Sequence, residues 1–295
     1  MAQPFLVKLS VCAAIASSLL LSSCAKQQPD GRALFERVRP LSDAILADPQ
    51  RASSVQVAQA IGALEAVIQQ VPGRYGAGLA EEALGRVYLA LGEPAKARGY
   101  FTHIVWYYHQ YSDMGVMALI YIGRTYEAEQ NWEAAEKAYK AIDDQYQWSP
   151  LWLGAPLFVG EMYDRHGDRQ RAAEAYQRAV SLLQYRAERA PSPEVEAKIK
   201  MELATAHERL GQWAQAAAVL EPLESSSEAE VDRAAVLMRL GELYAVPGRD
   251  AAKARAALTR LVQEFPAHPR AGEARTQLER LASSLSPGSA SEPHR

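Results

Sequence analysis

The residues of this sequence whose types could do chemistry are two cysteines, six histidines and several adjacent carboxylates. The histidines are scattered, and none has the spacing to a second histidine or a cysteine that metal ligands need. Asp143 and Asp144 are neighbours, so on a helix their carboxyl groups point in different directions and form no acid pair. The glycine-rich, serine and zinc motifs of common enzyme classes are also missing from the sequence. The sequence therefore indicates no enzyme, no cofactor and no metal site.

Cys24 is the residue with the most specific chemical surroundings. Lys8 precedes the apolar run Val11–Leu21, and small residues lead from that run to Cys24. A charged start, a short apolar core and a small-residue exit are typical of a secretory signal. The core is shorter than the roughly 20 apolar residues that a membrane-spanning helix needs. Because Cys12 lies inside the leader, the mature chain would keep Cys24 alone and could form no internal disulfide.

The stretch Leu21-Ser22-Ser23-Cys24 resembles the lipobox of bacterial lipoproteins. That resemblance implies removal of residues 1–23 and lipidation of Cys24 by a diacylglycerol and an amide-linked acyl chain such as palmitate. Acyl chains hold a protein on a bilayer with about 0.8 kcal/mol per buried CH₂. Ala25 resembles the pattern sorted to the outer membrane, so the expected location is the cell envelope, lipid-anchored and facing the periplasm. An ordinary signal peptide with an incidental cysteine is the alternative.

Five segments of the remaining chain repeat one arrangement of small and aromatic residues. In one copy, Gly160 and Tyr163 precede Gly167, and Ala172 and Tyr176 then fall on one face of a second helix. Small residues allow two antiparallel helices to approach, and the rings fill the space beside them. The small residues that anchor the five copies lie 38, 37, 44 and 37 residues apart; they are Gly85, Gly123, Gly160, Ala204 and Gly241.

This arrangement resembles the tetratricopeptide repeat, whose usual period is about 34 residues, so longer connections are expected here. The resemblance covers about residues 79–281 and implies an all-α, right-handed solenoid of helix hairpins. One such hairpin cannot bury its apolar face alone and needs stacked neighbours. A hydrophobic content of 48%, few β-branched runs and no hairpin turn signals agree with helices packed on helices.

Around this solenoid the sequence predicts four further segments. The sequence of residues 261–278 is similar to that of residues 67–84, but no second helix is expected after it. Ala271–Leu281 is therefore expected to be a C-terminal capping helix. The predicted organisation is a signal at 1–23, a lipid-anchored tether at 24–32, a degenerate helix pair at 33–78 (Ala33–Ala47 and Val55–Val71), the solenoid at 79–282 and a disordered tail at 283–295.

The resemblance also implies a concave groove lined by the first helix of each hairpin, at its second, fifth, ninth and twelfth positions. Apolar and methionine side chains at the fifth position would form a floor suited to a peptide or helix. Arginines at the ninth position could take a carboxylate of the partner. An ordinary solvated surface is the alternative. The predicted groove residues are Arg86, Leu89, Met117, Ile120, Arg124, Glu127, Leu157, Glu161, Asp164, Met201, Glu208, Met238 and Glu242.

A dense group of aromatic residues surrounds Trp106, and a second group includes Trp152 one repeat later. Two interpretations stay open for these groups. The rings either lengthen the second helices and pack against the neighbouring repeat, or form a ledge for a partner, since aromatic residues are enriched in interface cores.

The formal charge of −3 gives no basic footprint for nucleic acid. The expected function is therefore a non-catalytic scaffold or adaptor that binds an envelope protein or peptide, with no small-molecule substrate. The turn at Pro266 resembles that of envelope lipoproteins in outer-membrane β-barrel assembly and of the Tol–Pal coordinators. One alternative is an accessory lipoprotein of secretion or exopolysaccharide export. An alternative of another class is a cell-wall-modifying enzyme, which would require a catalytic cluster.

Overall fold

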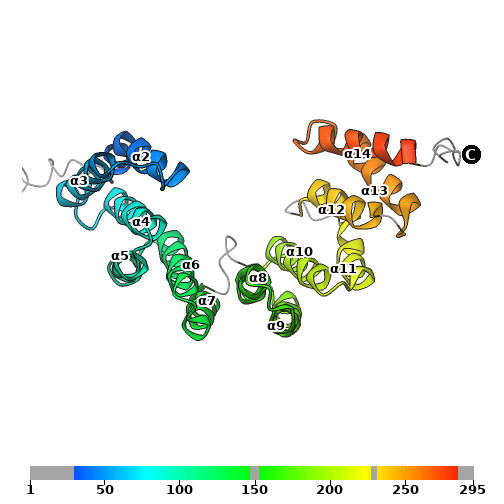
Figure 1. Ribbon diagram of the computed structural model, residues 1–295. Helices are drawn as coiled ribbons and strands as arrows, with labels where there is room; N and C mark the ends of the chain where they lie inside the picture. Colours follow the sequence, from blue (N-terminus) through cyan, green and yellow to red (C-terminus); the bar gives the residue numbers. More distant parts are fainter. Residues whose placement is uncertain (1–29, 147–152, 227–230, 247, 285–295) are drawn as a thin grey trace, which may run out of the picture. The chain divides into compact units, whose positions relative to one another are not determined.

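The computed structural model describes residues 30–146, 153–226, 231–246 and 248–284, and every regular element among these residues is a helix (Figure 1). The predicted all-α fold class is therefore confirmed. The elements are α2 (Arg32–Ala47), α3 (Ser54–Gln70), α4 (Tyr75–Ala90), α5 (Pro94–Tyr107), α6 (Ser112–Ala128), α7 (Trp132–Tyr146), η1 (Ala155–Leu157), α8 (Phe158–Arg165), α9 (Arg169–Ala187), α10 (Pro193–Arg209), α11 (Trp213–Leu220), η2 (Glu221–Leu223), α12 (Arg233–Ala245), α13 (Ala251–Glu264) and α14 (Ala271–Ser284).

The chain divides into two compact units, Met1–Ala118 and Leu119–Arg295, and the boundary falls inside α6. In the first unit, α2 packs against α3 and α4, and α4 forms a hairpin with α5. Helices α2 and α3 lie where the sequence predicts a helix pair. The Ser53 hydroxyl and the Gln56 side chain each bond the other's backbone N–H, which fixes the start of α3.

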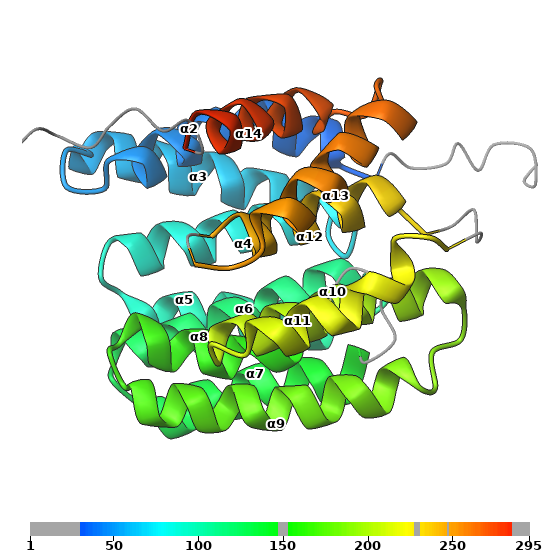
Figure 2. The same cartoon turned by 90° about the vertical axis from the view of Figure 1, so that its right-hand side faces the viewer.

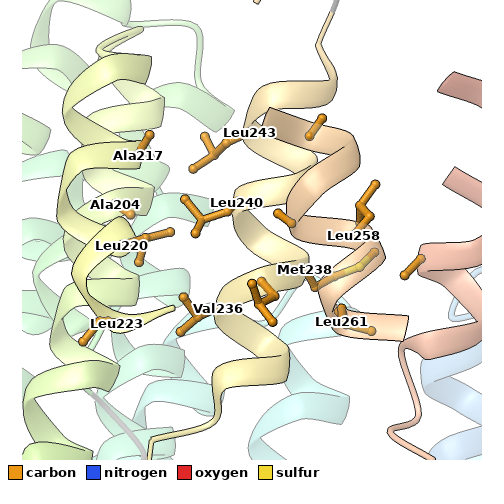
Figure 3. Close-up of a cluster of buried hydrophobic side chains, with 14 of the residues drawn as sticks. Ala204, Ala217, Leu220, Leu223, Val236, Met238, Leu240, Leu243, Leu258 and Leu261 are labelled. Carbon is orange, nitrogen blue, oxygen red and sulfur yellow. The ribbon is translucent and has the colours of Figure 1, made fainter. Parts of the chain in front are cut away.

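The second unit contains three complete helix hairpins, α8–α9, α10–α11 and α12–α13, which Figure 2 shows along their length. A continuous apolar cluster runs through α10–α14, and Figure 3 shows its centre. Leu220 and Leu258 are fully buried there, and burying such a side chain contributes about 1.5–3 kcal/mol. Helix α14, at the position of the predicted capping helix, packs on α13 and is the last helix of the described residues.

The spacing of small and aromatic residues acts as the sequence suggests. A Cβ added to Gly123 would lie 2.5 Å from Cζ of Tyr139, and one added to Gly160 would collide with the ring of Tyr176. Both rings are buried, so they occupy the space that the missing side chains leave. Each glycine therefore sets the distance between the two helices of its hairpin.

The turn inside each hairpin uses a residue with positive φ seven positions after the anchoring small residue. In four copies it is a glycine, which adopts this left-handed conformation without strain. The second copy places Gln130 there, with φ of 57°. The four glycines are Gly92, Gly167, Gly211 and Gly248, with φ between 70° and 85°.

Three details differ from the sequence prediction. Helix α2 begins at Arg32, inside the predicted tether, and α14 continues through Ser284, so the predicted tail starts as helix. Leu157 lies in the short η1 turn that precedes α8, because Pro156 stands at the start of this turn. The leader, Cys24, Trp152 and residues 285–295 lie outside the described residues. Within the described ranges, no helix combines the length and apolarity needed to span a bilayer.

Candidate functional site

A hollow of about 580 Å³ opens in the second unit, beside the turn between α10 and α11. Its walls come from α8, α10, α11, α12 and that turn, so consecutive hairpins supply them. Two of the predicted groove residues, Asp164 and Glu208, are among its lining residues. The lining residues are Asp164, Thr205, Glu208, Arg209, Gly211, Trp213 and Arg239.

Charged side chains are ordered along this hollow by ion pairs between hairpins. Arg239 Nη2 on α12 lies 2.6 Å from Glu208 Oε1 on α10, and Arg239 Nη1 lies 3.7 Å from Glu242 Oε2. Arg270 continues the chain of pairs, with Nη2 2.7 Å from Glu242 Oε1. Burial raises the pKa of Glu208, and the Arg239 guanidinium counteracts that rise. The predicted groove residues Glu208 and Glu242 therefore hold neighbouring hairpins together.

Trp213 gives the hollow an aromatic wall. Its side chain is 40% exposed, and the Arg249 guanidinium lies 3.7 Å from the centre of a Trp213 ring. Arg249 is itself held in place, because Nη1 donates to the Leu243 carbonyl at 2.6 Å. A ring that is exposed yet fixed by a cation is ready for contact without losing much conformational entropy.

Two carboxylates extend the site by one helical turn. Glu161 precedes Asp164 by three residues on α8, and Glu202 precedes Thr205 by three on α10, so each pair shares a helix face. Burial raises the pKa of Glu202, and the negative charge of Glu161 raises it further against the opposing effect of Arg239. The surroundings of Glu202 thus disfavour its ionised form, as they do for acids in many functional sites.

Asp164 and Glu127, two other predicted groove acids, are occupied by bonds within the protein. The Tyr176 hydroxyl donates to Asp164 Oδ2 at 2.7 Å. Glu127 accepts from the Tyr139 hydroxyl, and from Arg165 Nη2 on the next hairpin at 2.8 Å. These acids therefore serve first to join helices.

The network at Glu127 should make stability depend on pH in a defined direction. Burial alone would raise the pKa of Glu127, but bonds from Tyr139, Arg165 and His166 outweigh it and hold the pKa below the ordinary value. A carboxyl with a lowered folded pKa stabilises the fold above the ordinary pKa of about 4.3, and this stabilisation is lost as pH falls through the lowered value.

We therefore expect Glu127→Gln to lower the free energy of unfolding by about 1.5–3 kcal/mol at pH 7, since charged hydrogen bonds are lost. The difference in the free energy of unfolding between wild type and variant should become smaller below about pH 4. Urea unfolding followed by circular dichroism at both pH values checks this. Glu133→Gln, at an exposed site on α7, is the control and should change little. A gap that stays constant with pH would contradict the network.

The apolar floor predicted for the groove is mostly buried. Met238 has no exposed surface and packs in the cluster with Leu258 and Leu261 (Figure 3). Leu157 and Ile120 are also buried, at 3% and 9% exposure. The fifth position of these hairpins therefore belongs to the core, because the side chain is covered by the helices that pack around it. Met201 remains half-buried, at the edge of the same cluster.

In the first unit, the predicted residues lie on α4 and α6. Arg86 Nη1 is 3.8 Å from Glu82 Oε1, one turn away on α4, and Leu89 and Met117 are half-buried. Burial raises the pKa of Glu82, and Arg86 counteracts that rise. Arg124, an exposed residue near the end of α6, belongs to the second unit. That these side chains bind a partner stays a prediction.

Sequence reasoning missed Glu202, Arg209, Trp213 and Arg239. Glu202 and Arg239 occupy the sixth position of their repeats, which the concave-face pattern leaves out. A usable signal was present, because an acid and an arginine stand at this position in consecutive copies. Trp213 follows the turn residue Gly211 by two, where a large ring extends beyond the helix packing. No group of three histidine, cysteine or acidic side chains in the described part of the chain is arranged for a metal ion.

Comparison with known proteins points to the repeat already seen in the geometry. A family model described as tetratricopeptide repeat matches residues 235–268, the α12–α13 hairpin. No curated protein matches the sequence. Similar solved structures include a putative kinesin light chain with nearly identical TPR-like repeats from Podosopora anserina, with 20% identity over 70% of this chain and 95% of that chain and a TM-score of 0.38.

Two other similar structures are a tetratricopeptide repeat protein from Parabacteroides merdae and the MamA protein. The first has 13% identity over 85% of this chain and 99% of that chain, with a TM-score of 0.35. The second has 18% identity over 64% of this chain and 88% of that chain, with a TM-score of 0.34. The chain thus has an all-α, TPR-like fold with a tetratricopeptide repeat at α12–α13.

Proposed function

We propose that this protein is a lipid-anchored scaffold of a bacterial cell envelope that faces the periplasm and binds a protein partner through the hollow in its second unit. The observations that carry the proposal are the exposed, fixed ring of Trp213 in the hollow, and Glu202, whose ionised form is disfavoured by burial and by the charge of Glu161 and which lies one helical turn from the lining residue Thr205. A repeat array presents such a surface preformed, so binding costs little ordering of the receptor.

The chemistry of the hollow defines the partner segment. A lysine or arginine of the partner would lie near Glu161 and Glu202 and relieve their mutual repulsion. An aliphatic or aromatic side chain next to it would cover the exposed part of Trp213. The Glu208–Arg239 pair stays intact and offers polar atoms at the rim. The partner is therefore a basic peptide segment with an adjoining apolar residue.

Glu202→Gln separates a binding role from a structural one. Because the folded pKa of Glu202 is raised, its ionisation opposes folding above the ordinary glutamate pKa, and this cost disappears as pH falls below about 4.3. The variant should therefore be more stable than wild type at pH 7 and show no gain at low pH. It should also capture the partner at least about tenfold more weakly, a loss of roughly 1.4 kcal/mol.

The experiment combines urea unfolding of the purified variants with photocrosslinking in the native host. A crosslinking residue at Thr205, in the hollow, should capture one protein that a probe at the exposed Arg189 does not. Glu194→Gln, at a surface pair on the same helix, is the matched control and should leave capture unchanged. Equal capture from both probes, or a Glu202→Gln variant that captures as well as wild type, would overturn the proposal.

The envelope location is tested separately. Mass spectrometry of the mature N-terminus should find Cys24 acylated, and Cys24→Ala should release the protein from the membrane fraction. These outcomes concern attachment only, so they can fail while the hollow still binds its partner.

A further inference from the structure

Helix α5 ends in two exposed aromatic side chains, Trp106 at 78% and Tyr107 at 51% exposure; we call them the α5 aromatic pair. Large rings this exposed on a helix end mark a contact surface more often than a packing site. The pair does not help to stack the helices of its unit, because Phe101 and Ile104 of α5 are the residues buried for that purpose.

A buried carboxylate fixes this end of α5. Glu81, at 4% exposure, accepts the Tyr108 hydroxyl on Oε1 at 2.9 Å, and its Oε2 lies 2.6 Å from His103 Nδ1. The ring of Tyr107 then stacks on His103 with 5.0 Å between centroids and meets Tyr108 edge-on. The Tyr107 ring, next to Trp106 in the chain, is therefore held in one place before any contact is made.

The turn between α3 and α4 connects the pair with the point where the N-terminal segment joins the fold. The Tyr107 hydroxyl lies 3.4 Å from where a Cβ on Gly73 would be. Three residues later, the Gly76 N–H donates to the Asp30 carbonyl at 2.7 Å. Gly31 also packs against Val71 of the same turn. The turn and the first residues of α4 thus contact both Tyr107 and the start of the described chain.

The distance from this turn to the proposed lipid attachment is short. Six residue steps separate Cys24 from Asp30, and a fully extended chain spans about 3.3–3.6 Å per residue. The lipidated residue therefore lies within roughly 20 Å of Asp30. The contacts at Gly73 and Gly76 place Tyr107 near Asp30, so a bilayer that holds the acyl chains is also close to the α5 aromatic pair.

We propose that the α5 aromatic pair docks on the bilayer itself, with the Trp106 and Tyr107 rings in the interfacial layer between headgroups and acyl chains. Tryptophan and tyrosine prefer this layer, because the ring enters the apolar side while the N–H or O–H stays hydrated. The inference rests on the lipid attachment proposed above. The docked pair gives the first unit a second membrane contact, which gives this unit a defined orientation on the bilayer.

Tryptophan fluorescence with brominated lipids tests the docking. The chain from Cys24 to Arg295, which keeps every described residue, has Cys24 as its single thiol. That thiol is coupled to a maleimide lipid in phosphatidylcholine vesicles, with or without bromine on the acyl chains near the headgroup. Brominated vesicles should quench part of the fluorescence, Trp106→Phe should abolish that quenching, and Trp213→Phe should leave it unchanged.

Chemical coupling separates this inference from the attachment on which it rests, because the vesicle experiment works whether or not the cell acylates Cys24. Quenching that requires Trp106 supports docking. Quenching that persists in Trp106→Phe, or no quenching at all, overturns it and assigns the exposed pair to a protein partner. Trp106 is exposed, so its replacement leaves the fold intact, and circular dichroism of the variant verifies this.

Discussion

Arg186→Ala should lower the free energy of unfolding by about 3–5 kcal/mol, because it leaves the buried Oδ1 oxygen of the half-buried Asp143 without its partner. Arg186 on α9 is 2% exposed, and its Nη1 lies 2.7 Å from Asp143 Oδ1 on α7. Burial raises the pKa of Asp143, and the guanidinium opposes that rise. Without Arg186, nothing offsets the cost of burying the ionised Asp143 carboxylate. At neutral pH the variant therefore loses the ion pair and also retains this cost of burial.

Urea unfolding at pH 7 measures this loss. Arg178→Ala is the matched control, since Arg178 is on the same helix but 55% exposed, and its nearest Glu136 oxygen is 3.7 Å away; exposed pairs contribute about 0–1 kcal/mol. The double variant Asp143→Asn/Arg186→Met should recover much of the loss, because no unpaired charge remains buried. Equal losses for Arg186→Ala and Arg178→Ala would show that the ion pair is unimportant.

Gly160→Val should destabilise the protein by about 2–3 kcal/mol, the upper range for overpacking in a core. The added carbons would enter the space of the Tyr176 ring, which is 1% exposed and cannot move aside freely. Displacing that ring would also weaken the 2.7 Å bond from its hydroxyl to Asp164. Packing and hydrogen bonding are thus lost together.

Gly99→Val is the control, because it makes the same substitution at a site with open space. Gly99 is also inside a helix, but nothing lies within 4 Å of its missing Cβ. Valine has the higher helix propensity, so this variant should gain a few tenths of a kcal/mol. Thermal unfolding of both variants, followed by circular dichroism, should give shifts of opposite sign. Shifts of the same sign would mean that the contact between Gly160 and Tyr176 does not limit the hairpin.

The fold could be predicted because its determinants are local in the sequence. Gly160 and Tyr176 are close enough along the chain for their spacing alone to predict a hairpin, and the same spacing recurs in the other copies. The helix pair at α2 and α3 followed from apolar periodicity and the proline that ends it.

The site was only partly predictable, because burial depends on residues far away in the chain. Met238 has the right position on its helix for a groove, yet its hairpin and the cluster around it cover it completely. Glu202 lies against Gly154, where a Cβ would be 2.8 Å from Oε2, and near the charge of Glu161. Neither neighbour can be predicted from the amino-acid sequence of one repeat. Periodicity predicts which side chains share one face of a helix. Whether those side chains are exposed depends on how the neighbouring helices pack against that face.

The bonds between tyrosines and acids determine how this array could be lengthened or recombined. Tyr139 and Tyr176 on second helices are matched by Glu127 and Asp164 on the first helices of the same hairpins. Exchanging one helix alone would leave a buried hydroxyl or carboxylate without a partner, so the whole hairpin is the smallest unit that can be copied. Glu127 and Glu208 also take arginine partners, Arg165 and Arg239, from the following hairpin. A duplicated hairpin therefore keeps these charges paired only where the hairpin after it supplies the matching arginine.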